Sequence, residues 1–260
     1  MESRGYDPLE IGEVVRRFIV KRVGGRELRK YYRFRGGRWY GGIATADCVG
    51  CNLSCRFCWN WRVNTGLRSV GRFYTGEEVA RRIISIARRR GYRQARISGG
   101  EPTLSMDNLI EVLETLNREE PRLLFILETN GIVLGARKEE ACRLACFPNV
   151  HVRVSIKGTS PEEFHILTGA KPEAFELQLK ALENLLDCGV SAHPSVMLSF
   201  STHEGFERLL NRLREIDPVL AAEVEEEYVF LYPHVVELLK RYGLKPRIAF
   251  SPDNIPEELI

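Results

Sequence analysis

Three cysteines within eight residues constrain this 260-residue chain more than any other feature. Cys51, Cys55 and Cys58 are spaced four and then three residues apart, which suits a short loop wrapped around a soft, thiolate-binding metal centre. An iron–sulfur cube normally has four cysteine ligands, so a loop with three leaves one iron open to a ligand that is not protein. The spacing therefore predicts a metal centre that takes part in chemistry.

A second motif begins about forty residues after the cysteines. Ser98-Gly99-Gly100-Glu101-Pro102-Thr103 lies at the end of a predicted strand. Together with the Cys-x3-Cys-x-aromatic-Cys loop, in which Phe57 is the aromatic residue, it resembles the paired signature of the radical S-adenosylmethionine (radical SAM) enzymes. The resemblance covers roughly residues 40 to 245, which is most of the chain.

The resemblance implies a cofactor set and a reaction. Cys51, Cys55 and Cys58 would bind one [4Fe–4S] cluster, and the open iron would hold S-adenosylmethionine (SAM). An electron from a low-potential donor would cleave SAM to a 5′-deoxyadenosyl radical, which abstracts a hydrogen atom. Gly99 and Gly100 would allow close approach of the backbone to the cofactor, because no Cβ intervenes. The implied cofactor-binding residues are Phe57, Cys58, Gly99, Gly100, Glu101, Glu128, Ser155, Lys157 and His234.

Three further segments resemble the glycyl-radical-enzyme activating enzymes, the branch that contains the pyruvate formate-lyase activase. Glu128-Thr129-Asn130-Gly131 is similar to their Asp-Thr-Asn-Gly, Ser155-Ile156-Lys157 to their Asp-x-Lys, and Tyr232-Pro233-His234 to their His-ending segment. In this resemblance Lys157 holds the methionyl carboxylate of SAM by charge. Ser155 departs from the acidic residue of that branch.

Another interpretation of the cysteine loop stays open. Cys48 lies three residues before Cys51, so four thiolates are available for a zinc site, and the chain would then be a non-catalytic zinc or iron–sulfur protein. A disulfide framework is disfavoured because seven cysteines are an odd number and Met1–Arg4 lacks signal-peptide character. Of the other cysteines, Cys142 and Cys146 are predicted to be buried free thiols and Cys188 an inert thiol at a helix end. The histidines predicted to be structural are His151, His165, His193 and His203.

Strand and helix patterns alternate along most of the chain. This alternation predicts an α/β fold with a parallel sheet and right-handed crossovers. The predicted strands cover residues 39–46, 94–98, 123–129, 150–156, 191–198 and 224–232. Six strand–helix units match the incomplete (β/α)6 TIM-type barrel that the resemblance implies, and in such barrels the working residues lie at the C-terminal strand ends.

The sequence divides into three predicted parts. Residues 1–37 form a basic N-terminal extension with an amphipathic helix over residues 11–19 and a hairpin that turns at Gly36-Gly37. Residues 38–245 form the partial barrel. Residues 246–260 form a C-terminal tail, in which residues 247–250 are a candidate edge strand.

Charge is distributed unevenly, although the net charge is only +3. Residues 1–96 carry 22 Lys and Arg against 8 Asp and Glu, whereas residues 97–260 carry 16 against 27. A basic segment with interleaved aromatic residues suits an RNA or an acidic protein partner. Abundant arginine with only two glutamines is also typical of a thermophile, in which charged residues form solvated faces.

These observations predict a cytoplasmic radical SAM oxidoreductase. No apolar run reaches the roughly 18 residues that a membrane span needs, so no membrane partner is expected. The first predicted substrate class is a protein or peptide, as in the activation of a glycyl radical partner. The alternative is RNA or a nucleotide.

Overall fold

The computed structural model describes residues 5–256; the N-terminal residues 1–4 and the last part of the predicted tail, residues 257–260, lie outside this range. The strands are β1 (Val20–Val23), β2 (Arg26–Gly37), β3 (Ile43–Cys48), β4 (Arg72–Tyr74), β5 (Gln94–Ser98), β6 (Leu124–Thr129), β7 (Val150–Ile156), β8 (Ala192–Met197), β9 (Glu225–Glu227), β10 (Val229–Phe230) and β11 (Ala249–Phe250). The α-helices are α1 (Pro8–Ile19), α2 (Trp61–Thr65), α3 (Gly76–Arg90), α4 (Met106–Glu119), α5 (Ile132–Ala136), α6 (Lys138–Arg143), α7 (Pro161–Thr168), α8 (Phe175–Asp187), α9 (His203–Ile216), α10 (Pro218–Ala222) and α11 (Pro233–Tyr242).

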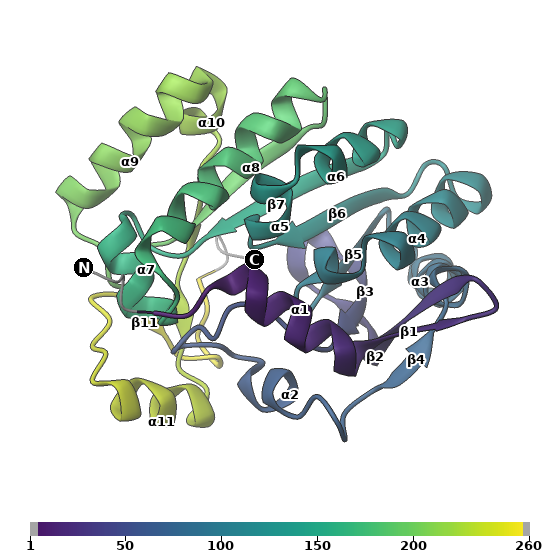
Figure 1. Ribbon diagram of the computed structural model, residues 1–260, viewed down its shortest axis with the longest axis horizontal. Helices are drawn as coiled ribbons and strands as arrows, with labels where there is room; N and C mark the ends of the chain where they lie inside the picture. The colour runs from purple at the N-terminus through teal and green to yellow at the C-terminus, as the bar shows by residue number, and fades with distance from the viewer. Residues whose placement is uncertain (1–4, 257–260) are drawn as a thin grey trace.

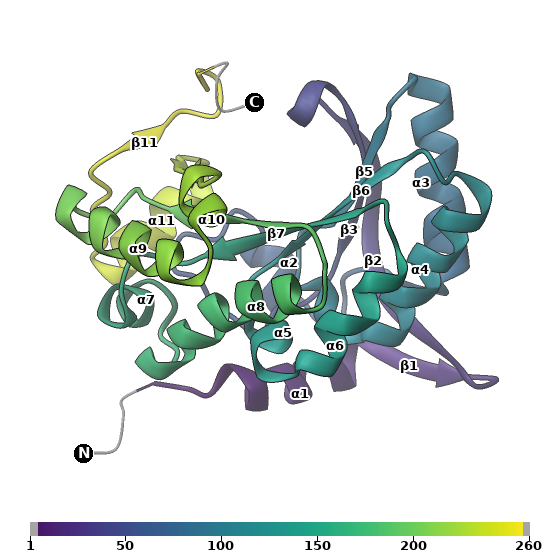
Figure 2. The ribbon, with the colours of Figure 1, turned by 90° about the horizontal axis from the view of Figure 1, so that it is seen from above.

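One mostly parallel sheet organises the fold, with strand order β1-β2-β3-β5-β6-β7-β8-β9. Strands β3, β5, β6, β7, β8 and β9 pair in parallel, whereas β2 pairs antiparallel with β1, β3 and β4. Helices α3, α4, α8 and α9 range along one face of the curved sheet (Figures 1 and 2). The predicted α/β class and mostly parallel sheet are confirmed. The six-unit barrel stays a prediction, because the last predicted strand is divided into β9 and β10.

Within residues 5–256, no helix combines the length and the apolar character needed to cross a bilayer.

The first and last predicted strands differ from the structure. Trp39–Gly41 is a 3₁₀ turn in which Tyr40 has a positive φ of 54°, so β3 begins only at Ile43. At the other end, β9 pairs with β8, whereas β10 pairs in parallel with β11. The chain therefore leaves the main sheet at Tyr228, and the candidate edge strand of the tail is present as β11.

The predicted hairpin turn at Gly36-Gly37 is wrong. The first hairpin joins β1 to β2 and turns at Gly24-Gly25, where both glycines have positive φ, as tight hairpin turns require. Gly36 instead lies within β2, where an added Cβ would meet the Tyr92 ring at 3.0 Å. Glycine at this position makes room for an aromatic side chain, and β2 continues into the sheet beside β3.

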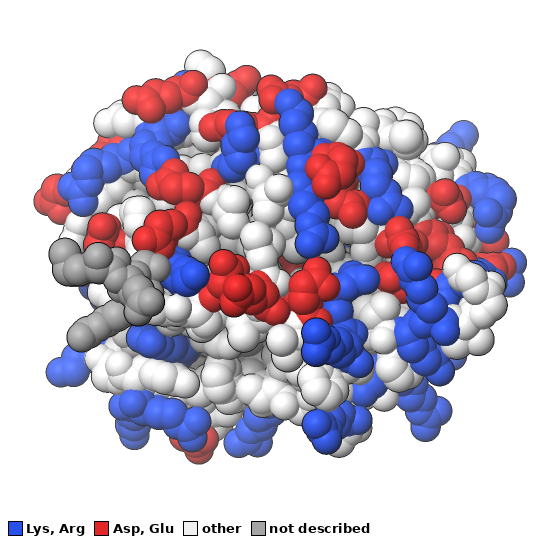
Figure 3. Space-filling view, viewed as in Figure 1, with Lys and Arg blue, Asp and Glu red and all other residues white. Residues whose placement is uncertain are grey.

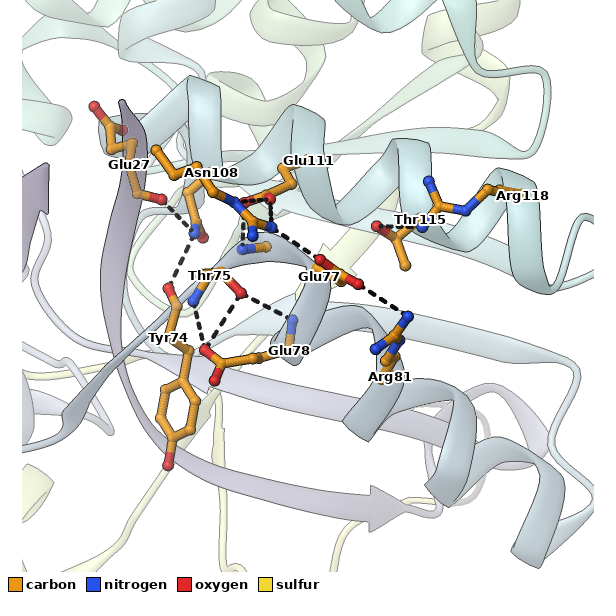
Figure 4. Close-up of polar contacts among 12 residues, drawn as sticks. Glu27, Tyr74, Thr75, Glu77, Glu78, Arg81, Asn108, Glu111, Thr115 and Arg118 are labelled. Carbon is orange, nitrogen blue, oxygen red and sulfur yellow. Dashed lines mark hydrogen bonds and ion pairs between the residues drawn. The ribbon is translucent and has the colours of Figure 1, made fainter. Parts of the chain in front are cut away.

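Helix α3 begins at a capping box that fixes its direction against α4. The Thr75 hydroxyl accepts a hydrogen bond from the Glu78 backbone, and the Glu78 carboxylate accepts one from the Thr75 backbone (Figure 4). Gly76 follows at a point of close approach, because an added Cβ would lie 2.5 Å from the Asn108 carbonyl oxygen. The Asn108 amide in turn donates to the Glu27 and Tyr74 carbonyls, which ties β2, β4 and α4 together.

Many arginines of the basic first third pair with carboxylates elsewhere in the chain. Arg26 lies between Glu77 at the start of α3 and Glu111 on α4, and Arg22 pairs with Asp107 at 3.0 Å. Figure 3 shows cationic and anionic side chains side by side over much of the face in view. Part of the charge asymmetry along the sequence is thus balanced by ion pairs within the fold.

A disulfide corrects the prediction that Cys142 and Cys188 are free thiols. Cys142 lies on α6 and Cys188 follows the last residue of α8, and the two sulfurs are bonded. Packing of α6 against α8 brings together residues 46 positions apart in the sequence, which no local pattern reveals. Cys146 is free, as predicted, but it is exposed, so the prediction of a buried thiol is wrong.

The disulfide should stabilise the chain measurably. Closing a loop of this length restricts the unfolded state by about 4 kcal/mol in the chain-entropy treatment. Cys142→Ser should therefore lower the free energy of unfolding by about that amount in urea melts without reductant. Cys146→Ser is the matched control and should leave it unchanged. Equal stability of the parent and Cys142→Ser would show that the bond does not form in solution.

Candidate active site

The predicted site residues converge on one cavity of about 580 Å³ at the C-terminal strand ends. The cavity reaches from the cysteine loop after β3 to strands β9 and β10 on the opposite edge. Its lining includes every residue of the predicted set, namely Cys51, Cys55, Phe57, Cys58, Gly99, Gly100, Glu101, Glu128, Ser155, Lys157 and His234. The structure therefore brings these residues together, and the roles assigned to them stay predictions.

The three cavity sulfurs are free thiols that lie near N–H groups. The Leu53 backbone N–H donates to Cys51 Sγ at 3.4 Å, and the Asn130 amide donates to the same sulfur at 3.6 Å. The Asn64 amide lies 3.9 Å from Cys58 Sγ. Hydrogen bonds of this kind stabilise thiolates that bind iron–sulfur clusters. Three free thiols lining one cavity, two of them with such partners, fit a cluster.

The protein alone does not favour the thiolate form of these cysteines. Burial raises the pKa of Cys51, and the nearby Glu101 adds to the rise. Burial also raises the pKa of Cys55, to about 12, although Lys157 opposes it. A bound metal centre must therefore supply the charge that holds the thiolates, and loading it releases protons.

Cys48 does not join the other three cysteines. It lies on β3, is fully buried, and contacts the Arg29 guanidinium at 3.5 Å, so it faces away from the cavity lining. Within residues 5–256, no three Cys, His, Asp or Glu side chains converge on a point where one metal ion could bind. A cube distributes its thiolates over separate irons, so sulfurs spaced around a cavity suit it.

The Gly-Gly motif serves close contact between two loops. The Glu101 N–H donates to the Gly50 carbonyl oxygen at 2.8 Å, just before Cys51. A Cβ on Gly100 would lie 2.3 Å from that oxygen, and one on Gly99 would lie 3.0 Å from the Cys48 oxygen. The missing Cβ atoms therefore admit the cysteine loop, and the predicted approach of this backbone to the cofactor stays a prediction.

Glu101 joins the ends of β5 and β6. Its carboxylate is 2% exposed and accepts hydrogen bonds from Thr103 N–H, the Thr103 and Thr129 hydroxyls and Asn130 N–H at 2.7–3.1 Å. Asn130 also donates to the Asn52 side chain at 2.7 Å. The carboxylate is fully engaged and therefore orders three loops around the cavity.

Lys157 and Ser155, at the end of β7, both contact Glu227. The Ser155 hydroxyl donates to Glu227 at 2.7 Å, and Lys157 Nζ lies 3.2 Å from the same carboxylate and also contacts Ser155. Burial by itself lowers the pKa of Lys157, but Glu227 and Cys55 outweigh it and raise the pKa overall. The ammonium group thus stays charged and faces the cavity, as an anion-binding role requires.

His234 and Phe57 make contacts that connect the cysteine loop to later parts of the chain. His234 Nε2 is 2.6 Å from the Trp59 carbonyl oxygen, directly after Cys58. The Phe57 ring packs 5.7 Å, centroid to centroid, from that of Phe200. These contacts position the loop, and both residues remain in the cavity lining.

Ion pairs that the sequence did not predict line the inner wall. Arg96 pairs with Glu128 at 2.5 Å, and Arg153 pairs with Glu225 at 2.6 Å and with Glu227 at 2.9 Å. Arg33 and Arg35 from β2 share the buried Asp47 carboxylate. Only alternate positions on each strand face the cavity. A polar or charged residue at every second position of these strands was therefore the sequence pattern that could have predicted the ion pairs.

Two histidines that had no predicted partner do have partners. His151 Nε2 lies 2.6 Å from His193 Nδ1, and His193 Nε2 lies 3.1 Å from the Glu225 carboxylate. The pair stacks with ring centroids 4.9 Å apart. Neighbouring parallel strands β7 and β8 bring the rings together, which is a tertiary effect.

Comparison with known proteins defines the family. The model of the Radical SAM superfamily matches residues 47–213. A probable GTP 3′,8-cyclase of Pyrobaculum aerophilum is 32% identical over 143 residues, covering 54% of this chain and 42% of that protein. A probable GTP 3′,8-cyclase of Methanosarcina mazei is 28% identical over 218 residues, covering 82% of this chain and 58% of that protein. The chain thus spans about half the length of these relatives.

Solved structures show the same fold. A spore photoproduct lyase mutant with bound AdoMet and a dinucleoside spore photoproduct matches with a TM-score of 0.60 at 13% identity, covering 84% of this chain and 66% of that one. Streptococcus suis SuiB bound to S-adenosylmethionine matches with a TM-score of 0.53 at 16% identity, covering 80% of this chain and 46% of that one.

The chain belongs to the radical SAM superfamily, and it is an enzyme that uses SAM and a [4Fe–4S] cluster. The predicted glycyl-radical activating branch is wrong, because the curated relatives are named GTP 3′,8-cyclase. The strand-end segments that suggested that branch contribute here to a shared cavity architecture, and their likeness did not distinguish one branch from another.

Gly100→Ala should separate the two loops. The added Cβ would overlap the Gly50 oxygen, so the cysteine loop must move and iron content after anaerobic reconstitution should fall several-fold. Gly91→Ala is the control, since Gly91 has a positive φ of 69° with open space around it; it should cost about 1 kcal/mol of stability and keep its iron. Full iron in Gly100→Ala would contradict the close contact.

The Glu227 carboxylate should make stability depend on pH. Burial raises its pKa, but Lys157 and Arg153 outweigh burial and hold the pKa at about 2, below its usual 4.5. The stabilisation is therefore present above pH 4.5 and is lost as the pH falls towards 2. When the pH is lowered from 4.5 to 2, the free energy of unfolding measured in urea melts should fall for both proteins. The fall should be about 3 kcal/mol smaller for Glu227→Gln than for the parent, because the variant has no carboxylate to protonate at this position. Parallel pH profiles would contradict this assignment.

Proposed function

We propose that this protein is a radical SAM enzyme that takes a hydrogen atom from a nucleotide bound in the cavity. The observation that carries the proposal is a single cavity that contains the cysteine loop and is lined by arginine, lysine and glutamate side chains. The curated relatives named GTP 3′,8-cyclase support a nucleotide over the peptide that the sequence first suggested. Because the chain spans about half of those relatives, their reaction is not assigned to it.

The residues of this chain hold and orient the cofactors. Cys51, Cys55 and Cys58 would hold the cluster as thiolates; when bound and reduced by an external donor, it would supply the one electron for reductive cleavage of SAM. The Lys157 ammonium would hold the methionyl carboxylate by charge. Backbone groups of the Gly-Gly loop, fixed by Glu101, position the methionyl amino group.

The cavity walls suit a nucleotide. Arg33 and Arg35 place two guanidinium groups on one carboxylate, Asp47, which leaves positive charge for a phosphate on the β2 side. On the opposite edge, Glu225–Glu227 offers carboxylate acceptors for base N–H groups. A molecule with an anionic end and hydrogen-bond donors on a planar end is complementary to both walls.

Isotope transfer tests this function. With reconstituted protein, SAM and dithionite under anaerobic conditions, ribose-deuterated GTP should transfer deuterium into 5′-deoxyadenosine, detected by mass spectrometry. Cys55→Ala should form no 5′-deoxyadenosine. ATP and unrelated peptides serve as comparison substrates. Formation of unlabelled 5′-deoxyadenosine at a rate that no nucleotide changes would contradict the nucleotide assignment while leaving the cofactor chemistry intact.

A further inference from the structure

Arg29 contacts both the cysteine loop and the Gly-Gly loop. It lies on β2 and is 1% exposed. Its Nη2 donates to the Glu101 carbonyl oxygen at 2.8 Å and to the Val49 carbonyl oxygen at 3.1 Å, and it lies 3.5 Å from the Gly50 oxygen. One guanidinium group from the N-terminal part of the chain therefore contacts both the cysteine loop and the Gly-Gly loop.

Among the described residues, Arg29 forms no ion pair with a carboxylate. Within residues 5–256, its Nε and Nη1 have no hydrogen-bond partner, and no carboxylate oxygen lies within 4 Å of it. A buried cation without an ionic partner costs several kcal/mol, so such an arrangement is retained where an anion offsets it. The cysteine loop that Arg29 touches is the place where three thiolates and a cluster bring negative charge.

We propose that Arg29 is a positioning residue that sets the separation of the two loops and whose charge favours the reduced cluster. The inference rests on the proposed cluster ligands Cys51, Cys55 and Cys58. Reduction adds one electron to a group that is already negative, so a nearby buried cation stabilises the reduced form more than the oxidised form. By fixing the Glu101 carbonyl, the same group also maintains the backbone that orients SAM.

Neighbouring residues show why the guanidinium is needed. All of its contacts with these carbonyl oxygens are made by Nη2, which lies one bond further from the backbone than the Nζ of a lysine would. Lys30, the next residue on β2, is also buried, but its Nζ donates to the Leu67 and Arg68 carbonyl oxygens at 2.6 and 3.3 Å. It is therefore a buried cation on the same strand that serves a different loop.

Three variants separate charge from geometry. Arg29→Gln removes the charge. Arg29→Lys keeps the charge but shortens the side chain, so that the Nη2 contacts are lost. Lys30→Gln is the matched control. Each is reconstituted anaerobically, and iron and sulfide are counted first. The cluster reduction potential is then measured by EPR-monitored redox titration without SAM, and SAM affinity by equilibrium binding.

The proposal predicts a distinct result for each variant. Arg29→Gln should have a lower reduction potential than the parent, and Arg29→Lys should stay near the parent. Both should bind SAM about tenfold more weakly, because the Gly-Gly loop loses its anchor. Lys30→Gln should match the parent in both measurements.

Two outcomes would overturn the proposal. One is parental potential and SAM affinity in Arg29→Gln with a full cluster. The other applies if Arg29→Gln does not fold: Arg29→Lys that binds SAM as tightly as the parent would then overturn the proposal. A parent protein that binds no iron would instead overturn the proposed ligand set, so the two failures are distinguishable.

Discussion

The hydrogen bond from Glu101 N–H to the Gly50 carbonyl oxygen is the contact on which the site depends. Strands β3 and β5 are parallel neighbours with Asp47 opposite Ser98, so the loops that follow them leave the sheet side by side. At 2.8 Å the two backbones touch, and only glycine at position 100 permits it. The cysteine loop and the Gly-Gly loop are thereby held as one unit.

The polar inner wall of the sheet is the second constraint. Buried ion pairs such as Arg153 with Glu227 are seldom more stabilising than apolar residues of the same size, because desolvation offsets the Coulomb attraction. A chain selected only for stability would fill this space with apolar side chains, as it does between the sheet and helices α3, α4 and α8. The charged cavity is therefore best explained by a ligand with charges of its own.

The cluster loop and the Gly-Gly-Glu-Pro motif were predictable because their information is local. The spacing of these motifs and the positions of the strand ends were sufficient to predict which residues lie close together, and all of them line one cavity. The contact of Gly100 with the Gly50 oxygen was not predicted, because the sequence does not show which backbone approaches a glycine. The contacts of Arg29, the Cys142–Cys188 bond and the pairing of His151 with His193 depend on tertiary packing between residues distant in sequence.

Electron–nuclear double resonance of the reduced cluster with SAM labelled with ¹⁵N at its amino group tests the central claim most directly. If three cysteines leave one iron open, the nitrogen binds that iron and a ¹⁵N coupling appears in the spectrum. The same coupling should be absent when unlabelled SAM is used. A well-formed cluster that binds SAM and shows no such coupling would contradict the account of an open iron in this cavity.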